Sequence, residues 1–324
     1  MTRQMRAVLL HRTGGPEQLR PGMIAEPEPA VGQSLVDVTL AGVNFDDLEQ
    51  RAGSAPLPGL PAVLGVDAVG RRRVDGRRVA VLLRRGGGYA AVVAADDRYT
   101  VELPDHIDDA QGSALLEQGG TAYGGLVLAG RLQPGEAVAI SAAAGGVGHL
   151  AVQLALAYGA HPVIGLASTP AKRALVASLG AHQVLDPAAG PIGEQLRAAT
   201  DGSGVDLVLD SVGGEPARSA LAGVSPFGRL VSIGWRPDKG PFDVSAAELT
   251  GGSVGCAGFW MRHVVDDRRR LSAIADELFD LAKRGLLTAR IDRVLPLERA
   301  ADAHRALESR ATAGKVLLDL GNGG

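Results

Sequence analysis

The sequence is poor in the residues that bind metals or form disulfides. It has a single cysteine, Cys256, in 324 residues. One cysteine excludes a disulfide within the chain and any metal site built from several thiolates. The seven histidines are scattered, and no two of them have the short spacing of a pair of metal ligands. We therefore expect no bound metal.

Long apolar runs and a dominant charge are also missing. No apolar run approaches the roughly 20 residues that a transmembrane helix needs. The N-terminal stretch "MTRQMRAVLLHRTGG" has an apolar core too short for a signal peptide and is typical of a first strand. The formal net charge is −3, which gives no reason to suspect nucleic acid. We expect a cytoplasmic protein that acts on a small molecule and binds neither nucleic acid nor a membrane.

The pattern of the chain changes near Asp108. Before it, short β-like runs alternate with glycine and proline clusters such as "GSAPLPGLP", which predicts a β-barrel-like domain. From Gln133 onward strand and helix patterns alternate, which predicts a parallel sheet covered on both faces. Residues 287–320 hold one strand, one helix and a final strand, and could return to the first domain. A chain of this length fits two domains better than one.

The stretch Ser141–Ala160, "SAAAGGVGHLAVQLALAYGA", places glycines between a buried strand and a buried helix. Where a strand meets a helix N-terminus, unpaired backbone N–H groups and the helix dipole attract anions. The spacing Ala143-x-Gly145-x-x-Gly148 is the dinucleotide fingerprint with its first glycine replaced by alanine. A Cβ would hold a phosphate away from such a loop, so the sequence predicts a dinucleotide site here.

Within this loop the residues have different predicted roles. Gly145, Gly146 and Val147 are predicted to hold the pyrophosphate of the cofactor. For Gly148 tight strand–helix packing is the better explanation, as the third glycine of the fingerprint usually provides it.

The stretch after the second strand, "GLASTPAKRA", indicates which dinucleotide is bound. An NAD site usually offers an acidic residue there, about 20 residues after the fingerprint, and this stretch has none. It offers the hydroxyls of Ser168 and Thr169, followed by Lys172 and Arg173 on the first turn of a helix. These groups suit a 2′-phosphate, so we predict NADPH rather than NADH. The alternative is that both cations lie on a solvated helix face.

Seven segments in chain order point to a known family: "AGVNFDDLEQRAG", "LPAVLGVDAVG", "GGTAYGGL", "SAAAGGVGHLAVQLA", "LVLDSVGG", "GRLVSIG" and "ALESRATAGKVLL". Several are generic, but "GVN", "AAAGGVG" and "ESRATAGK" in this order are specific. The chain resembles the medium-chain dehydrogenase/reductase superfamily, in its zinc-independent quinone oxidoreductase branch. The resemblance runs nearly from end to end.

The resemblance implies an α/β fold with two domains. Residues 1–114 and 264–324 would form a GroES-like β-barrel substrate domain, and residues 115–263 a Rossmann domain with a doubly wound parallel sheet. It also implies a homodimer in which the strand from Ser253 to Phe259 pairs across the interface. The alternative for this strand is an ordinary edge strand, which would need protection.

Zinc-dependent members of the superfamily carry a cysteine directly after the "GV" of the first motif and a histidine in "GHE". In this chain those positions hold Asn44 and Val66. Zinc-assisted alcohol oxidation is therefore not expected. The remaining straightforward chemistry is hydride transfer from nicotinamide C4 to an electron-poor carbon, as in a quinone, an enone or an enoyl thioester.

The resemblance also implies residues beside the nicotinamide. Asn44 would donate to an enolate oxygen and Thr121 would hold the carboxamide, although Asn44 could simply be a turn residue that supports its loop. Tyr123 is a candidate proton donor, or packs at the start of a helix. Asp46 and Asp47 fit helix-capping and first-turn positions better than acid–base catalysis.

Further cofactor contacts are expected at strand ends and in the tail. They are Ser211 and Val212 after one strand and Ile233, Gly234 and Trp235 after the next. The resemblance also implies a contact from the tail by Lys315, after Gly314. The alternative for Lys315 is a surface lysine.

Two departures from the family bear on the substrate. Many quinone reductases of this branch carry a tyrosine in the first helix region, where this chain has Glu49. The loop between "LGVDAVG" and "RRVAVLL" is also unusually short.

The preferred hypothesis is an NADPH-dependent, zinc-free reductase of a quinone or conjugated enone. One alternative is an enoyl reductase that tailors products of secondary, polyketide-type metabolism. Another is an NADPH-binding protein with little turnover, because no unmistakable proton donor is present. A zinc-free alcohol dehydrogenase is a further alternative, against which Asn44 and Val66 argue.

Overall fold

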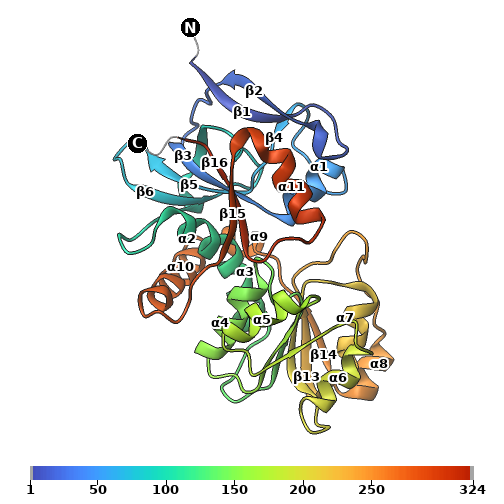
Figure 1. Cartoon of the computed structure of the whole chain (residues 1–324). Coiled ribbons are helices and arrows are strands. Elements are labelled where there is room, and N and C mark those ends of the chain that lie inside the picture. The colour runs from blue at the N-terminus through green and yellow to red at the C-terminus, as the bar shows by residue number, and fades with distance from the viewer. Residues whose placement is uncertain (1–2, 322–324) are drawn as a thin grey trace. The chain divides into compact units, whose positions relative to one another are not determined.

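The computed structural model describes residues 3–321, which form two compact units (Figure 1). Among the described residues, the first unit comprises residues 3–117, 262–283 and 288–321, and the second comprises residues 118–261 and 284–287. These divisions lie within three residues of the predicted domain boundaries, apart from the short segment 284–287. In the described residues, no helix combines the length and the apolar character needed to cross a membrane.

The first unit is built on β-structure. A mixed sheet has the strand order β15-β16-β3-β5-β6-β8, with β7 paired to β3, and a smaller antiparallel sheet has the order β2-β1-β4. Its strands are β1 Gln4–Leu10, β2 Leu19–Ala25, β3 Gln33–Val43, β4 Ala62–Val63, β5 Asp67–Arg72, β6 Arg78–Leu82, β7 Val92–Asp96, β8 Thr100–Glu102, β15 Ile291–Pro296 and β16 Lys315–Asp319. The tail returns to this unit, because β16 pairs antiparallel with β3.

Helices flank these sheets and end where local signals predict. They are α1 Phe45–Ala52, α2 Asp109–Ala114, α9 Arg262–Val265, α10 Arg268–Lys283 and α11 Ala300–Glu308. Asn44 is the N-cap of α1 and forms a capping box with Asp47, and Gly53 ends the helix in the left-handed conformation. Asp46 and Asp47 are therefore first-turn residues of α1, as expected.

The second unit is a parallel sheet with the strand order β11-β10-β9-β12-β13-β14. Its strands are β9 Val138–Ile140, β10 Val163–Leu166, β11 Gln183–Leu185, β12 Val205–Asp210, β13 Val224–Ser232 and β14 Gly255–Gly258. After β9 the chain adds β10 and β11 on one side and then β12, β13 and β14 on the other. The reversal between β9 and β12 is the topological switch point at which such sheets bind ligands. The predicted α/β fold class is confirmed.

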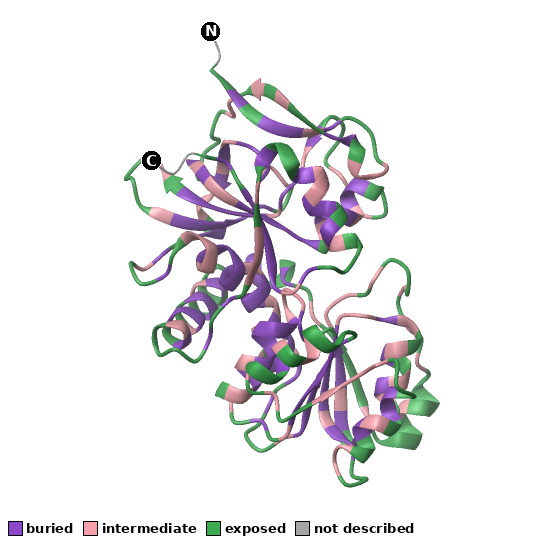
Figure 2. Ribbon diagram, in the orientation of Figure 1, coloured by how far each residue is buried: buried purple, intermediate pink, exposed green. Residues whose placement is uncertain are grey.

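The helices of the second unit are α3 Gly120–Tyr123, α4 Gly148–Ala157, α5 Pro170–Ser178, α6 Ile192–Ala198, α7 Gly214–Leu221 and α8 Ala246–Gly252. Helix α4 is apolar on nearly every side, and Leu150, Val152 and Leu154 are fully buried. Figure 2 shows the same burial along the central strands of the sheet. This packing fixes the N-terminus of α4 directly after β9.

Candidate functional site

The loop between β9 and α4 contains a tight turn. The N–H of Gly145 donates to the carbonyl of Ala142 at 2.8 Å, and Ala142 has a positive φ of 45°. Gly145, Gly146 and Val147 are half-buried, whereas Gly148 is buried. A Cβ on Gly148 would overlap the Ala142 carbonyl, which confirms its predicted packing role. The three residues predicted to hold the pyrophosphate are therefore less buried than Gly148.

His149 supports this loop from the first turn of α4. Its side chain is fully buried, and its Nδ1 lies 2.8 Å from the carbonyl oxygen of Gly145. A carbonyl only accepts, so Nδ1 carries the proton. His149 was not among the predicted site residues, although its position four residues after Gly145 is the spacing of one helical turn.

The segment after β10 presents the groups predicted for a 2′-phosphate. Ser168 and Thr169 are exposed, and the Thr169 hydroxyl caps α5 by accepting from the N–H of Lys172 at 3.2 Å. Lys172 and Arg173 are half-buried. Arg173 Nη1 also donates to Asp186 Oδ2 at 2.8 Å, a contact that the sequence did not reveal. No acid follows β10 itself, but Asp186 follows β11 and reaches the first turn of α5.

Asp210 organises the loop that follows β12. It is buried, and burial raises the pKa of its carboxyl while N–H bonds oppose the shift. Its Oδ2 accepts from the N–H groups of Val212 at 3.2 Å and Gly213 at 2.8 Å. The N–H of Ser211 donates to the Ser141 hydroxyl at 2.8 Å, which ties this loop to the end of β9.

The loop after β13 packs against the loop after β12. The N–H of Arg236 donates to the carbonyl of Val212 at 3.1 Å, and a Cβ on Gly213 would overlap Trp235. Ile233 and Gly234 are half-buried, and Trp235 is exposed. The predicted cofactor residues after β9, β10, β12 and β13 thus all lie at the carboxyl end of one parallel sheet.

Thr121 and Tyr123 lie on α3 of the second unit. The Tyr123 ring contacts Tyr158 edge-on, with ring centroids 6.1 Å apart. Tyr158 caps the C-terminal end of α4, about 15 Å along the helix axis from the glycine loop. This contact supports the packing alternative for Tyr123. The half-buried Thr121 keeps its predicted role as a hypothesis.

Asn44 is buried in the first unit among charged side chains. Its Oδ1 accepts from Lys315 Nζ at 3.0 Å, and its Nδ2 donates to Asp67 Oδ1 at 2.5 Å. Lys315 is 1% exposed, so it is not a surface lysine. Its expected contact with the cofactor stays a prediction. Asp67 directly follows Val66 and was not among the predicted site residues.

Asp47 holds the backbone around Asn44. Its two carboxylate oxygens accept from the N–H groups of Asn44 and Gly65, each at 2.9 Å. Burial raises the pKa of Asp47 to about 7, although these two N–H bonds oppose the shift. Beside it, Tyr89 Oη lies 3.0 Å from His304 Nε2, and burial lowers the pKa of His304 to about 3. The two bonds of Asp47 tie the start of α1 to Gly65.

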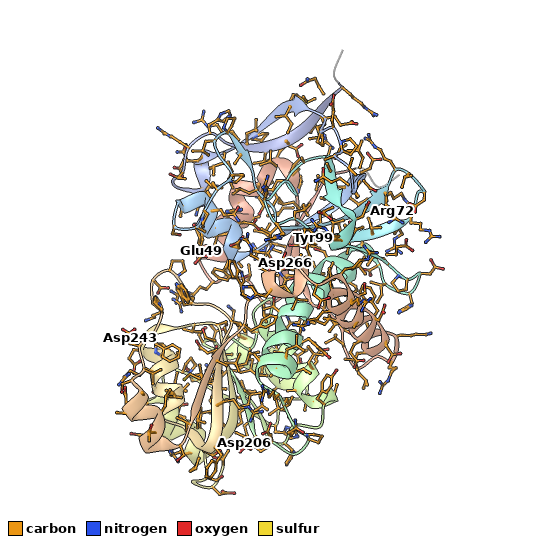
Figure 3. The ribbon with its side chains drawn as sticks, turned by 180° about the vertical axis from the view of Figure 1, so that it is seen from behind. Glu49, Arg72, Tyr99, Asp206, Asp243 and Asp266 are labelled. Atoms are coloured by element: carbon orange, nitrogen blue, oxygen red, sulfur yellow. The ribbon has the colours of Figure 1, made fainter. Side chains whose placement is uncertain are left out.

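Three further carboxyls of the first unit have altered acidity. Burial raises the pKa of Glu117 to about 8, and the neighbouring Asp67 carboxylate adds to the shift. Burial also raises the pKa of Asp46 and that of Glu49. Figure 3 labels Glu49. Glu49 is half-buried on α1, where many quinone reductases have a tyrosine. These groups hold protons more tightly than ordinary carboxyls.

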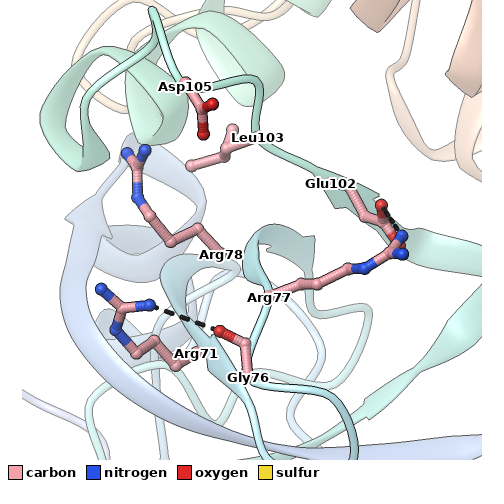
Figure 4. A pocket seen from close by; sticks show the side chains of 7 residues that line it. All are labelled: Arg71, Gly76, Arg77, Arg78, Glu102, Leu103 and Asp105. Atoms are coloured by element: carbon pink, nitrogen blue, oxygen red, sulfur yellow. Dashed lines mark hydrogen bonds and ion pairs between the residues drawn. The ribbon is translucent and has the colours of Figure 1, made fainter.

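A surface pocket of about 330 Å³ in the first unit is lined by arginines and acids (Figure 4). Its lining residues are Arg71, Gly76, Arg77, Arg78, Glu102, Leu103 and Asp105. Arg77 pairs with Glu102, and Arg78 pairs with Asp109. None of the predicted site residues lines this pocket.

The positions that bind zinc in related dehydrogenases have no metal-binding side chains here. Asn44 is engaged by Lys315 and Asp67, and Val66 has no donor atom in its side chain. Across residues 3–321, no three His, Cys, Asp or Glu side chains gather as ligands of one metal ion.

Fold and loops together define a dinucleotide-binding protein of two units, and comparisons with known proteins agree. The family model described as zinc-binding dehydrogenase matches residues 146–279. A quinone oxidoreductase of Pseudomonas aeruginosa is 35% identical, with 94% of this chain and 96% of the relative covered. A 2-haloacrylate reductase of Burkholderia sp. is 30% identical, with 96% and 98% covered. The crystal structure of Escherichia coli quinone oxidoreductase complexed with NADPH has a TM-score of 0.91 at 31% identity, covering 97% and 99%.

The chain belongs to the medium-chain dehydrogenase/reductase family, in its quinone oxidoreductase-like branch. The family predicted from the sequence motifs is therefore confirmed.

Proposed function

We propose that the protein is an NADPH-dependent oxidoreductase that transfers hydride to a quinone or a conjugated enone. The observation that carries the proposal is the glycine cradle at the N-terminus of α4, beside the switch point of the parallel sheet. The similarity to the E. coli enzyme complexed with NADPH supports the choice of cofactor.

The residues of the second unit fit this cofactor. Backbone N–H groups of Gly145, Gly146 and Val147 would hold the pyrophosphate, because these residues are only half-buried and the helix dipole favours an anion. The Ser168 and Thr169 hydroxyls and the cations of Lys172 and Arg173 would hold the 2′-phosphate. Of the two cations, Lys172 carries the larger share in this proposal, because Arg173 already pairs with Asp186.

The nicotinamide half would lie along the loops after β12 and β13. We assign Ser211, Val212, Ile233, Gly234 and Trp235 to this half, and Thr121 to its carboxamide. When bound, reduced NADPH supplies the hydride. The protein orients the acceptor and stabilises the oxygen that takes up negative charge, and we assign the donor at that oxygen to Asn44.

A specific observation favours one further substrate class. The 2-haloacrylate reductase is similar over nearly the whole of both chains, and its name describes reduction of a conjugated acid. An enoyl reductase that tailors polyketide-type products therefore remains the second candidate. An NADPH-binding protein with little turnover is the third.

We also propose that the protein is a homodimer joined through β14, within the predicted strand from Ser253 to Phe259. Strand β14 is the last strand of the sheet order, pairs with β13, and is exposed at all of its residues. An exposed edge strand offers unpaired N–H and C=O groups to a second chain. The cytoplasmic location stays a prediction that cell fractionation tests.

The function is tested by following NADPH oxidation by absorbance with quinones, enones and enoyl thioesters, with NADH in parallel. We expect turnover with one acceptor class and a clear preference for NADPH. Turnover of enoyl thioesters alone would select the tailoring enzyme. Tight NADPH binding without turnover of any acceptor would contradict the reductase and leave the binding protein.

A further inference from the structure

Asn44, Asp67 and Lys315 form a closed ring of polar contacts, which we call the buried trio. Lys315 Nζ lies 3.0 Å from Asn44 Oδ1 and 3.2 Å from Asp67 Oδ1. Asn44 Nδ2 donates to the same Asp67 oxygen at 2.5 Å. Each member therefore contacts the other two. The second Asp67 oxygen accepts from the Ser113 hydroxyl at 2.7 Å.

The core of the first unit is shaped to hold these charges. Lys315 and Asp67 are each 1% exposed and Asn44 is 8% exposed. Gly42 on β3 faces the pair, and a Cβ at that position would overlap both the Asp67 carboxylate and the Lys315 ammonium. Removing two charges from water is costly, and an apolar pair of similar volume is often as stable. Stability alone therefore does not account for an ion pair at this place.

The trio determines which way the Asn44 amide faces. An ammonium has only donors and an ionised carboxylate only acceptors. The amide oxygen must therefore face Lys315, and the amide nitrogen must face Asp67. A flipped amide would set donor against donor and acceptor against acceptor. Without both charges, the amide keeps the longer contact of Nδ2 with Asp47 Oδ2, at 3.4 Å, and its orientation is less strongly fixed.

We propose that Lys315 and Asp67 are positioning residues that lock the Asn44 amide, so that one N–H of Nδ2 is held by Asp67 and the other, in a long contact of 3.4 Å with Asp47 Oδ2, serves as the donor toward the oxygen of the acceptor. A donor fixed in advance costs no reorganisation when charge develops, which is how such groups lower a barrier. The inference rests on the proposed function, because it assigns a task to Asn44 in that reaction.

Two variants separate this role from stability. Lys315→Met removes the cation and leaves Asp67 buried and unpaired, so we expect a lower Tm and a lower kcat. The double variant Asp67→Asn with Lys315→Met removes both charges and keeps both shapes. We expect its Tm to return close to that of the wild type. Its kcat should stay about 10- to 100-fold low, near the effect of losing one oriented donor.

Binding and controls complete this experiment. The dissociation constant for NADPH, measured by fluorescence titration, should stay within about twofold in the double variant, since the lock acts on the acceptor. Leu318→Ala creates a cavity on the same strand and should lower Tm without lowering kcat at temperatures where it is folded. Lys283→Met removes an exposed lysine and should change neither. Recovery of kcat together with Tm in the double variant, or a large loss of NADPH affinity, would overturn the proposal.

The orientation of the Asn44 amide can also be tested without turnover, because the sequence contains few asparagines. The chain has only two asparagines, Asn44 and Asn322. Selective ¹⁵N-asparagine labelling therefore gives two side-chain amide groups, which Asn322→Ser assigns. In the wild type we expect two well-separated Asn44 amide protons that exchange slowly with water, and in the double variant faster exchange and altered shifts. Asn44 amide protons that exchange as fast as those of Asn322 in the wild type would overturn the lock, whether or not the double variant folds.

The two proposals fail in different ways. Absence of turnover by the wild type contradicts the proposed reductase, while a protected Asn44 amide still demonstrates the lock. If the wild type is active but its Asn44 amide is mobile, the proposed reductase stands and the positioning role is contradicted.

Discussion

The Nη1 atom of Arg173 lies 2.8 Å from the Oδ2 atom of Asp186, and the same nitrogen donates to the carbonyl of Ala167 at 3.1 Å. The guanidinium is therefore already occupied on one side by an acid and a backbone oxygen. Lys172 lies beside it in the first turn of α5 and is the other cation for the 2′-phosphate.

This difference predicts how cofactor preference changes on mutation. Lys172→Met should weaken NADPH binding about tenfold, since a charge-assisted hydrogen bond contributes roughly 1.5 kcal/mol, and should hardly affect NADH. Asp186→Asn should strengthen NADPH binding a few-fold, because it removes a negative charge near the phosphate. Fluorescence titrations check both, with Lys283→Met as the control. Unchanged NADPH affinity in Lys172→Met would argue that this lysine lies on a solvated face.

The packing of Gly148 predicts that a larger side chain at this position lowers the stability of the fold. In Gly148→Ala the new Cβ would overlap the Ala142 carbonyl and lie 2.8 Å from Ala143 Cα. We expect a loss of roughly 1–3 kcal/mol, which corresponds to a Tm lower by about 2–10 °C, together with weaker NADPH binding. Gly251→Ala is the matched control on α8, because a Cβ there meets nothing within 4 Å. Equal Tm values for the two variants would contradict the tight strand–helix contact.

Glu117 predicts a pH dependence of stability. Burial raises the pKa of its carboxyl from 4.5 to about 8 in the folded protein, so the folded state binds this proton more tightly than the unfolded chain. Its contribution to the free energy of unfolding is fully present below pH 4.5 and is lost as the pH rises through 8. Glu117→Gln, which cannot ionise, should therefore gain in Tm relative to the wild type between pH 5 and 9. Parallel Tm curves for the two proteins would show that Glu117 does not titrate in this way.

The exposed edge of β14 predicts how the dimer can be broken. Ala257 is exposed on β14, and Ala257→Asp would place two like charges next to each other if two copies pair along this strand. Light scattering coupled to size-exclusion chromatography should then show a dimer for the wild type and a monomer for the variant. The control is Val74→Asp, which places the same charge at an exposed position of the first unit. A wild-type monomer, or a dimer that survives Ala257→Asp, would contradict pairing through β14.

Some of these features can be predicted from the sequence, because the residues that determine them lie close together in the chain. The glycine loop lies within one strand–helix unit, and the order of apolar runs and glycines predicts its place at the sheet. The first-turn positions of Asp46 and Asp47 follow in the same way, because acidic side chains are favoured at the start of a helix. Strand β14 was also expected, because its apolar segment follows the alternating strands and helices of the same sheet.

Other features depend on contacts between distant parts of the chain. Lys315 and Asp67 are 248 residues apart in sequence, and their contact depends on β16 pairing with β3 beside β5. No local pattern distinguishes this lysine from a surface lysine. The pair of Arg173 with Asp186 likewise needs β11 beside β10. Single-sequence patterns assign residues to elements, whereas these contacts arise only after the sheets form.

The cofactor site at the carboxyl end of the parallel sheet is the central claim. Its most direct test is a titration of the wild-type protein with NADPH and with NADH, followed by energy transfer from tryptophan to the reduced nicotinamide. Trp235 lies in the loop assigned to the nicotinamide half, so Trp235→Phe shows how much of the signal arises there. The account predicts saturable binding, at least about tenfold tighter for NADPH than for NADH. Equal affinity for the two cofactors, or no saturable binding of either, would contradict it.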